Sequence, residues 1–250
     1  MTLPGSAVGM GGEIRTQAVL IDAMGTLLRL EDPAPRLREA LRARLGIDVG
    51  HGAAAAAIRA EIAFYRTHMH LGRDVGTLAA LRERCAEAMR PALPARAADL
   101  PGPELTAALL EALVFAPHAD AAPALRALRA AGCRLVVVSN WDWSLHERLD
   151  EIGLAALVDA TVASAELGVA KPARAIFEHA LALAGVPRER AWHVGDSLRE
   201  DVEGAHAAGI RPVLLARGSR AERAALSAPA PVVRSLAELP GLVAGAAPYA

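Results

Sequence analysis

The stretch AVLIDAMGTLL, residues Ala18 to Leu28, decides the fold predicted for this 250-residue chain. Its apolar residues Ala18 to Ile21 are followed by one acid, Asp22, and then by a turn signal at Gly25 and Thr26. A short apolar run bounded by a turn is typical of a buried strand in a parallel sheet. Asp22 is then expected at the carboxyl end of that strand, where open α/β sheets bind their ligands. Taken alone, Asp22 could equally cap the turn.

From Pro117 onward, short apolar segments alternate with helical patterns. Strands are predicted at 134–138, 160–163, 192–194 and 212–215, with a further candidate at 232–233. Helices are predicted at 123–131, 145–153, 173–184 and 201–208. Strands that alternate with helices of about 10 to 15 residues indicate βαβ units. The predicted fold class is therefore α/β, with a parallel sheet.

Residues 33–115 interrupt this pattern with a helical insert. Helices are predicted at 36–45, 53–71, 77–89 and 104–115, separated by Gly and Pro. In the second of these, Ile58, Ile62, Tyr65 and Met69 recur at helical spacing on one face. We therefore divide the chain into a flexible leader (1–17), a core (18–32 and 116–250) and a helical insert (33–115).

Composition excludes several classes of protein. The net charge is −1 and no basic stripe is present, so nucleic-acid binding has no electrostatic support. No apolar run approaches the roughly 20 residues of a membrane span, and the first 17 residues lack the pattern of a signal peptide. The two cysteines, Cys85 and Cys133, lie far apart without metal-binding spacing. They predict buried thiols in a reducing compartment, the cytoplasm.

Polar residues follow four of the predicted strands, and we expect them to meet at one edge of the sheet. They are Asp22, Ser139 with Asn140, Lys171, and Asp196 with Asp201. Lys171 is the single lysine of a chain with 27 Lys plus Arg, and Asn140 is its single asparagine. A carboxylate, a hydroxyl and a cation suit nucleophilic displacement such as phosphoryl transfer.

The three aspartates also predict a metal site. Crowded carboxylates repel by roughly 4 kcal/mol per close pair at an effective dielectric constant of 20. Mg²⁺ commonly binds one or two carboxylates together with substrate phosphate oxygens. Simpler roles stay open for each residue alone: Asp196 or Ser197 as a helix cap, Ser139 and Asn140 as a turn, and Lys171 as a solvated loop residue.

Taken together, these motifs resemble those of the haloacid dehalogenase (HAD) superfamily from Ala18 to Leu239. IDAMGTL resembles the first motif, VVVSN the second, GVAKPARAIF the third and HVGDSLREDVEGAHAAG the fourth. The resemblance implies a Rossmann-like three-layer sheet core and an inserted all-helical cap of type 1, which closes over the site and sets specificity.

The resemblance also implies roles for individual residues. Asp22 is implied as the nucleophile that forms an aspartyl intermediate, with Ser139 and Lys171 holding the anionic group of the substrate. Thr26, in the loop of the first motif, and Asn140 are implied at the substrate site with Lys171. The implied Mg²⁺ ligands are Asp22, Asp196 and Asp201 with the backbone carbonyl of Met24.

Met24 departs from the pattern of the family's phosphatases, which usually carry a second aspartate there as general acid and base. Such catalysis typically contributes about 10²–10⁴-fold. We predict a slow Mg²⁺-dependent phosphatase acting on a small phosphorylated metabolite. The alternatives are a metal-independent 2-haloacid dehalogenase, whose halide leaves without a proton, and a catalytically weakened binding or scaffold protein.

Five further residues have open roles at this stage. Arg66 and His70 form an i, i+4 pair on a predicted helix, with His68 nearby. Either histidine could supply the missing proton, or the three residues could form a solvated helix face. Trp141 and Trp143 could line a substrate pocket or contact the helical insert.

Overall fold

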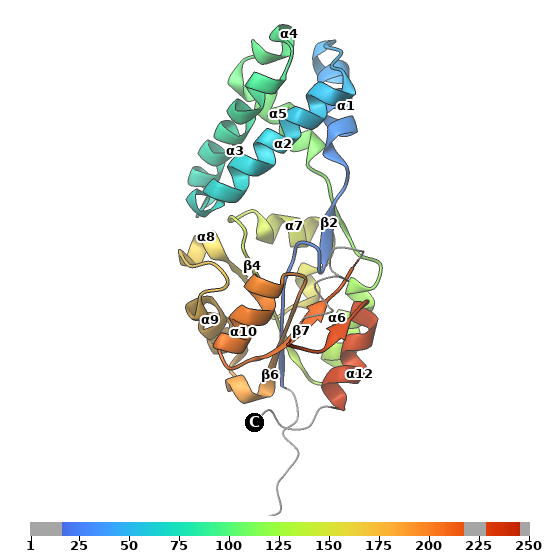
Figure 1. Cartoon of the computed structure of the whole chain (residues 1–250), viewed down its shortest axis with the longest axis vertical. Helices are drawn as coiled ribbons and strands as arrows, with labels where there is room; N and C mark the ends of the chain where they lie inside the picture. The colour runs from blue at the N-terminus through green and yellow to red at the C-terminus, as the bar shows by residue number, and fades with distance from the viewer. Residues whose placement is uncertain (1–16, 218–228, 246–250) are drawn as a thin grey trace, which may run out of the picture.

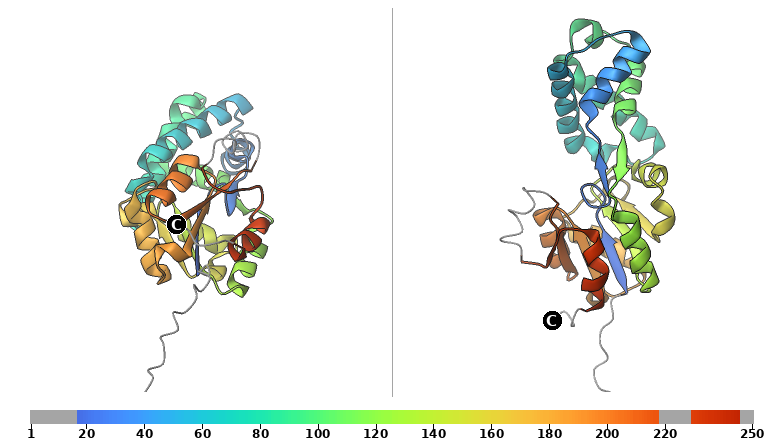
Figure 2. Two further views of the ribbon diagram at one scale, coloured as in Figure 1. Left: turned by 60° about the horizontal axis from the view of Figure 1, so that its bottom comes forward. Right: turned by 90° about the vertical axis from the view of Figure 1, so that its right-hand side faces the viewer.

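The computed structural model describes residues 17–217 and 229–245 (Figure 1). Nearly all of the leader predicted at 1–17 therefore lies outside the described residues. A sheet with helices on both sides forms one part of the molecule, and a bundle of helices rises from one end of it (Figures 1 and 2). No helix in the described ranges combines the length and the hydropathy that a membrane crossing requires.

Six strands form one sheet in the order β5-β4-β1-β6-β7-β8, with every neighbouring pair parallel. The strands are β1 (Ala18–Ile21), β4 (Arg134–Ser139), β5 (Ala160–Ala163), β6 (Ala191–Gly195), β7 (Arg211–Leu215) and β8 (Val232–Val233). Ile21, at the end of β1, pairs with Val137 on one side and Val194 on the other. The carboxyl ends of β4, β1 and β6 therefore lie side by side, with that of β1 in the middle.

Helices cover both faces of the sheet, which makes three layers. Val19 and Ile21 belong to the apolar cluster under α6 (Ala121–Ala130), α7 (Leu145–Glu151) and α12 (Leu239–Ala244). Ala18 and Leu20 belong to the opposite cluster, under α9 (Arg174–Ala184) and α10 (Gly204–Ala207), where Phe177 is fully buried. Because both faces are buried, β1 and β4 are continuous apolar runs. The predicted α/β fold with a three-layer parallel sheet is confirmed.

The helical insert has an apolar core of its own. It consists of α1 (Pro33–Leu45), α2 (His51–His68), α3 (Val75–Met89), α4 (Ala95–Ala98) and α5 (Gly102–Ala112). Leu37, Leu41, Met89, Leu105 and Leu109 are buried among these helices. Each large apolar side chain removed from water in this way contributes about 1.5–3 kcal/mol.

A short antiparallel pair, β2 (Leu28–Leu30) with β3 (Phe115–Pro117), joins the insert to the sheet. The sequence did not predict this pair. The helix expected at 104–115 ends at Ala112, and Phe115 pairs with Leu30 instead. Strands of three residues are too short to show a period, so tertiary pairing decides their conformation.

Two other predicted helices also differ in their bounds. The helix expected at 53–71 ends at His68 and continues as a 3₁₀ turn, Met69–Leu71. The helix expected at 201–208 begins earlier, as a π-helix over Leu198–Glu203 followed by α10. Both predicted thiols, Cys85 and Cys133, are free and buried.

Candidate active site

Asp22 lies directly after β1, at the centre of the sheet edge. Its backbone N–H donates to the carbonyl of Val194 on β6, at 2.9 Å, which extends the sheet pairing by one residue. The residue is 5% exposed. Its Oδ1 accepts hydrogen bonds from Ser139 Oγ on β4, at 3.1 Å, and from Lys171 Nζ, at 2.7 Å. The structure thus brings together the first three predicted site residues.

Lys171 joins two aspartates through one buried ammonium. Its Nζ donates to Asp22 at 2.7 Å and to Asp201 Oδ1 at 2.6 Å, and its side chain is 1% exposed. Burial opposes the charged ammonium, but Asp201 and Asp22 outweigh that effect and raise the pKa of Lys171. Burial raises the pKa of Asp22 although Lys171 opposes the shift. For Asp201, Lys171 and His193 outweigh burial and lower the pKa.

Asn140 holds the backbone of Lys171 from both sides. Its Oδ1 accepts from the N–H of Lys171 at 2.7 Å, and its Nδ2 donates to the carbonyl of Lys171 at 3.0 Å. The same Nδ2 donates to Glu200 Oε2 at 3.1 Å. The amide predicted to bind substrate is therefore engaged in placing Lys171.

Asp201 lies in the π-helix that follows β6 and is fixed by three donors. Besides Lys171, His193 Nε2 lies 2.9 Å from its Oδ1, and the N–H of Ser197 donates to its Oδ2 at 2.9 Å. Ser197 itself caps the helix that follows, because its Oγ accepts from the N–H of Glu200 at 3.1 Å. The capping role left open for this motif thus belongs to Ser197.

Asp196 is the exposed member of a group of three carboxylates. Oxygens of Asp22, Asp196 and Asp201 lie within 4.8 Å of one another. Burial of the carboxyl group, with Asp22 and Asp201 nearby, raises the pKa of Asp196 to about 7. A cation among these oxygens would favour their charged forms, and oxygen donors are the ligands that Mg²⁺ prefers. The donor set therefore fits a divalent cation.

Glycine is required where the first turn passes this group. Gly25 has φ of 80°, and a Cβ there would lie 2.2 Å from Asp196 Oδ2. The turn can approach Asp196 only if residue 25 has no side chain.

Met24, in the same turn, is 37% exposed. Thr26 is fully buried, and its hydroxyl has no hydrogen-bond partner within the described ranges, so it lies outside the hydrogen-bonded cluster.

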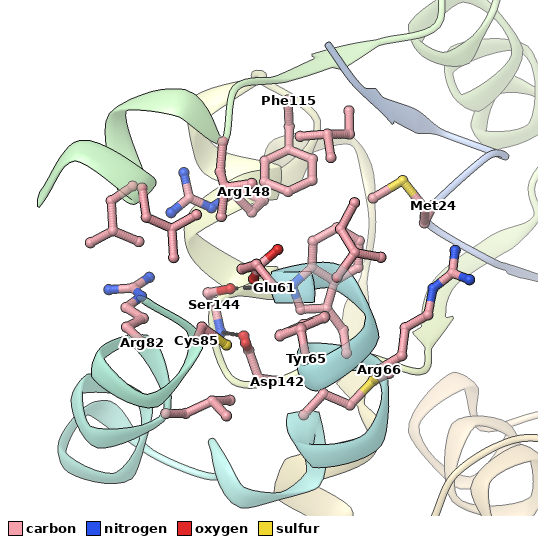
Figure 3. Close-up of a pocket in the computed structure, with 18 of the residues that line it drawn as sticks. Met24, Glu61, Tyr65, Arg66, Arg82, Cys85, Phe115, Asp142, Ser144 and Arg148 are labelled. Carbon is pink, nitrogen blue, oxygen red and sulfur yellow. Dashed lines mark hydrogen bonds between the residues drawn. The ribbon is translucent and has the colours of Figure 1, made fainter. Parts of the chain in front are cut away.

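A pocket of about 320 Å³ opens between this edge and the helical insert (Figure 3). Met24, Asn140 and Trp141 line it from the sheet side, and α2 contributes Glu61, Ile62, Tyr65 and Arg66. Most of the other lining residues are apolar, among them Leu30, Leu81, Leu109, Leu110, Leu113 and Phe115. The pocket thus borders the loop that carries Asp22.

The structure separates the residues whose roles were left open. Arg66 lines the pocket, whereas His68 stacks on Phe64, with ring centroids 4.0 Å apart, and His70 is exposed. Trp141 is buried and lines the pocket, with its Nε1 donating to Ser144 Oγ at 3.2 Å. Trp143 contacts the insert, because its N–H donates to the carbonyl of Gly72 at 2.8 Å.

Sequence reasoning missed three ionisable residues near this site: His193, Glu200 and Glu61. His193 is hidden within the apolar pattern of β6, and Glu200 lies just before the helix predicted at 201–208. Glu61 carried a usable signal. It lies three residues after Ile58 and four before Tyr65, which puts a charged side chain on the apolar face of α2.

Comparisons with known proteins agree with this geometry. A sequence model of haloacid dehalogenase-like hydrolases matches residues 16–209. The chain is 40% identical over 92 residues to haloacid dehalogenase-like hydrolase domain-containing protein 3 of Bos taurus, covering 37% of each chain. It is 36% identical over 125 residues to glyceraldehyde 3-phosphate phosphatase of Methanopyrus kandleri, covering 47% of this chain and 54% of the relative. These two matches thus span about a third to a half of each relative's length.

A longer match extends over most of the chain. The ribulose-1,5-bisphosphate 5-phosphatase of Halopiger xanaduensis is 30% identical over 212 residues, covering 79% of this chain and 83% of the relative. Solved structures with a similar fold include the following two. A HAD phosphatase from Thermococcus onnurineus has a TM-score of 0.60 at 24% identity, covering 92% of this chain and 98% of that one. The L-2-haloacid dehalogenase of Xanthobacter autotrophicus has a TM-score of 0.65 at 23% identity, covering 93% and 100%.

Proposed function

The chain belongs to the haloacid dehalogenase-like hydrolases, and we propose that it is a Mg²⁺-dependent phosphatase acting on a small phosphorylated metabolite. The observation that carries the proposal is the set of three carboxylates, Asp22, Asp196 and Asp201, whose oxygens lie within 4.8 Å of one another. With Lys171 as the cation that pairs with Asp22 and Asp201, the set keeps a net negative charge. Such a site favours a divalent cation and, with it, a phosphate group.

In this proposal Asp22 is the nucleophile. One of its oxygens attacks the phosphorus, the bond to the leaving-group oxygen breaks, and an aspartyl phosphate forms. Ser139 and Lys171, which both reach Asp22 Oδ1, would hold the oxygens of the transferred group. Water then attacks phosphorus, which releases phosphate and restores the carboxylate.

The metal would be held by Asp22, Asp196 and the backbone carbonyl of Met24, and it would supply positive charge to the phosphoryl oxygens. Asp201 already accepts hydrogen bonds from Lys171, His193 and Ser197, so we assign it a supporting role, in which it holds these groups in place beside the metal. We assign the helical insert the role of a cap over the pocket.

The two free, buried cysteines support a cytoplasmic location.

Met24 limits the leaving groups that the enzyme can use. A thioether cannot protonate a departing alkoxide, so esters of poorly acidic alcohols should be slow by roughly 10²–10⁴-fold. Esters of acidic phenols do not need this proton. We therefore expect a strong preference for p-nitrophenyl phosphate over alkyl phosphates.

The first test is the hydrolysis of p-nitrophenyl phosphate with Mg²⁺ and with EDTA. Turnover should require both the metal and Asp22, and it should fall below detection in Asp22→Asn. Asp150→Asn, an exposed residue of α7, is the matched control and should keep full activity. Turnover that persists in Asp22→Asn would contradict the assignment of the nucleophile.

Met24→Asp tests the leaving-group argument directly. This variant should raise turnover of an alkyl phosphate by roughly 10²–10⁴-fold and leave p-nitrophenyl phosphate little changed. Met24→Asn changes polarity without supplying an acid and serves as the control. Equal gains in the two variants would refute the argument.

A second candidate, 2-haloacid dehalogenase, is favoured by one observation, the missing acid at Met24. Single turnover in H₂¹⁸O separates the two reactions. Water attack on the phosphorus of an aspartyl phosphate leaves the Asp22 oxygens unchanged, whereas attack on the carboxyl carbon of an ester intermediate places ¹⁸O in Asp22. Turnover of 2-chloropropionate without metal, with labelled Asp22, would replace the phosphatase proposal.

A further inference from the structure

The pocket beyond the catalytic edge contains two buried acids that the proposed reaction does not use, Glu61 and Asp142. Glu61 lies on α2, is 3% exposed, and points into the pocket (Figure 3). Within the described ranges its hydrogen-bond partner is the thiol of Cys85, which is a weak donor. A buried carboxyl group with so little support is costly in its charged form.

The groups around Glu61 add negative rather than positive charge. Asp142 also lines the pocket, and its Oδ1 accepts from the N–H of Ser144 at 2.7 Å. Burial raises the pKa of Glu61 to about 7, and it also raises the pKa of Asp142. Burial and the nearby Asp142 raise the pKa of Tyr65, so its hydroxyl stays neutral.

The arginines of the pocket do not compensate for Glu61, because two of them have other partners. Arg82 pairs with Glu147 at 2.9 Å, and Arg148 pairs with Glu151 at 2.5 Å. Arg66 has no acidic partner in the part of the chain that the structure describes. Its guanidinium lies on the Met24 side of the pocket, towards the catalytic loop (Figure 3).

Most of the residues that line the pocket are apolar, and charged side chains lie at separate places among them. Arg66 offers a positive charge beside the loop where phosphate would lie, and Glu61, earlier on the same helix α2, offers a negative charge at a buried point of the pocket. An ammonium beside Glu61 would stabilise its carboxylate and replace the missing partner. The volume, about 320 Å³, is at the small end of the range for small-molecule sites.

We propose that this pocket selects phosphate esters whose leaving group is apolar and carries a cationic amine, and that Glu61 binds the amine. The inference rests on the proposed phosphatase function for its substrate, but the amine site itself can be tested without turnover. Glu61 acts here in specificity and takes no part in the chemical step.

Three aryl phosphates of equal heavy-atom count provide the test by turnover: 4-(2-aminoethyl)phenyl, 4-(2-hydroxyethyl)phenyl and 4-propylphenyl phosphate. For the wild-type protein, kcat/KM of the amine should exceed that of the propyl compound by about 10- to 100-fold, as expected for a charge-assisted hydrogen bond. In Glu61→Gln this ratio should fall at least about tenfold. Glu83→Gln, an exposed residue of α3 in the same insert, should keep the wild-type ratio.

Binding of 2-phenylethylamine and 2-phenylethanol, measured by calorimetry, tests the site independently of catalysis. The wild-type protein should bind the amine more tightly than the alcohol, and Glu61→Gln should lose that difference. If no phosphate ester is hydrolysed but this pattern appears, the proposed function fails and the amine site stands. If esters are hydrolysed but the amine has no advantage in the wild-type protein, or keeps it in Glu61→Gln, the inference is overturned.

The wild-type comparison of amine with alcohol does not depend on the folding of any variant. A preference for the hydroxyethyl compound over both others would also overturn the inference. It would show that Glu61 is protonated and donates to a neutral hydroxyl group.

Discussion

Replacing Lys171 by Met should destabilise the protein strongly, because it leaves Asp22 and Asp201 buried without their shared cation. The ammonium lies 2.7 and 2.6 Å from the two carboxylates, and all three side chains are at most 8% exposed. Removing one partner of a buried ion pair costs about 3–5 kcal/mol. For a chain of this size each kcal/mol lowers Tm by about 2–4 °C, so Tm should fall by roughly 6–20 °C.

The loss should depend on pH in a defined direction. Without Lys171, the pKa of Asp22 loses the cation that opposes its upward shift, and the pKa of Asp201 loses the strongest of the effects that lower it. The folded variant then binds more protons than the folded wild-type protein, so its stability relative to wild type falls as pH rises. Lys171→Met should therefore lose more stability relative to wild type at pH 8 than at pH 5.

Urea denaturation in EDTA at both pH values measures this effect. Arg174→Met is the control, because Arg174 forms an exposed pair with Glu178 a few residues away, and exposed pairs contribute about 0–1 kcal/mol. The double variant Lys171→Met/Asp201→Asn should recover part of the loss, since it removes one of the unpaired charges. If Lys171→Met matches Arg174→Met in stability at both pH values, the buried network does not hold the site together.

Three further outcomes follow from the structure. Gly25→Ala should lower both Tm and activity, because φ at Gly25 is 80° and the new Cβ would lie 2.2 Å from Asp196 Oδ2. Differential scanning calorimetry measures the change in Tm, and a wild-type Tm would contradict this prediction. Mg²⁺ at 100 times its Kd should stabilise the wild-type protein by about 2.7 kcal/mol, and an equal thermal shift in Asp196→Asn would exclude Asp196 as a ligand. The pKa of Asp120 is lowered to about 2, because hydrogen bonds from Arg217 and Ser235 outweigh the effect of burial. Asp120 should therefore contribute about 2 kcal/mol to the free energy of unfolding at neutral pH, and this contribution should be lost as pH falls from about 4 to 2. Acid titration of Asp120→Asn should lack this component.

The sequence predicts those parts of the fold that show a clear pattern of apolar residues or a recognisable motif. β1 and β4 are continuous apolar runs that end in Asp22 and in Ser139, and their parallel pairing brings these two side chains to 3.1 Å. The pair β2 and β3 could not be predicted. Strands of three residues show no hydrophobic period, and the pairing joins segments far apart in the sequence, with Arg29 opposite Ala116 at its centre.

The same contrast holds for the site. Residues at strand ends converge because the topology of a parallel sheet requires it, so Asp22, Ser139 and Asp196 follow from strand assignment alone. Glu61 depends instead on how α2 of the insert packs over the sheet edge, which no local pattern determines. Its place on the apolar face of α2 indicated burial, but the pocket that it faces exists only in the assembled fold.

The only lysine and the only asparagine of this chain are in contact, and the contact explains why each residue type suits its position. Oxygens of two carboxylates share one ammonium in a space that excludes solvent. This geometry suits the compact charge of Lys171 and does not suit the planar guanidinium of arginine, which is the basic residue at every other Lys or Arg position of the chain. Asn140 must both accept from the N–H of Lys171 and donate to its carbonyl. An aspartate there could not donate, and it would set a carboxylate against Glu200 as well. The only lysine and the only asparagine of an arginine-rich chain thus stand where a point charge and a two-way amide are required together.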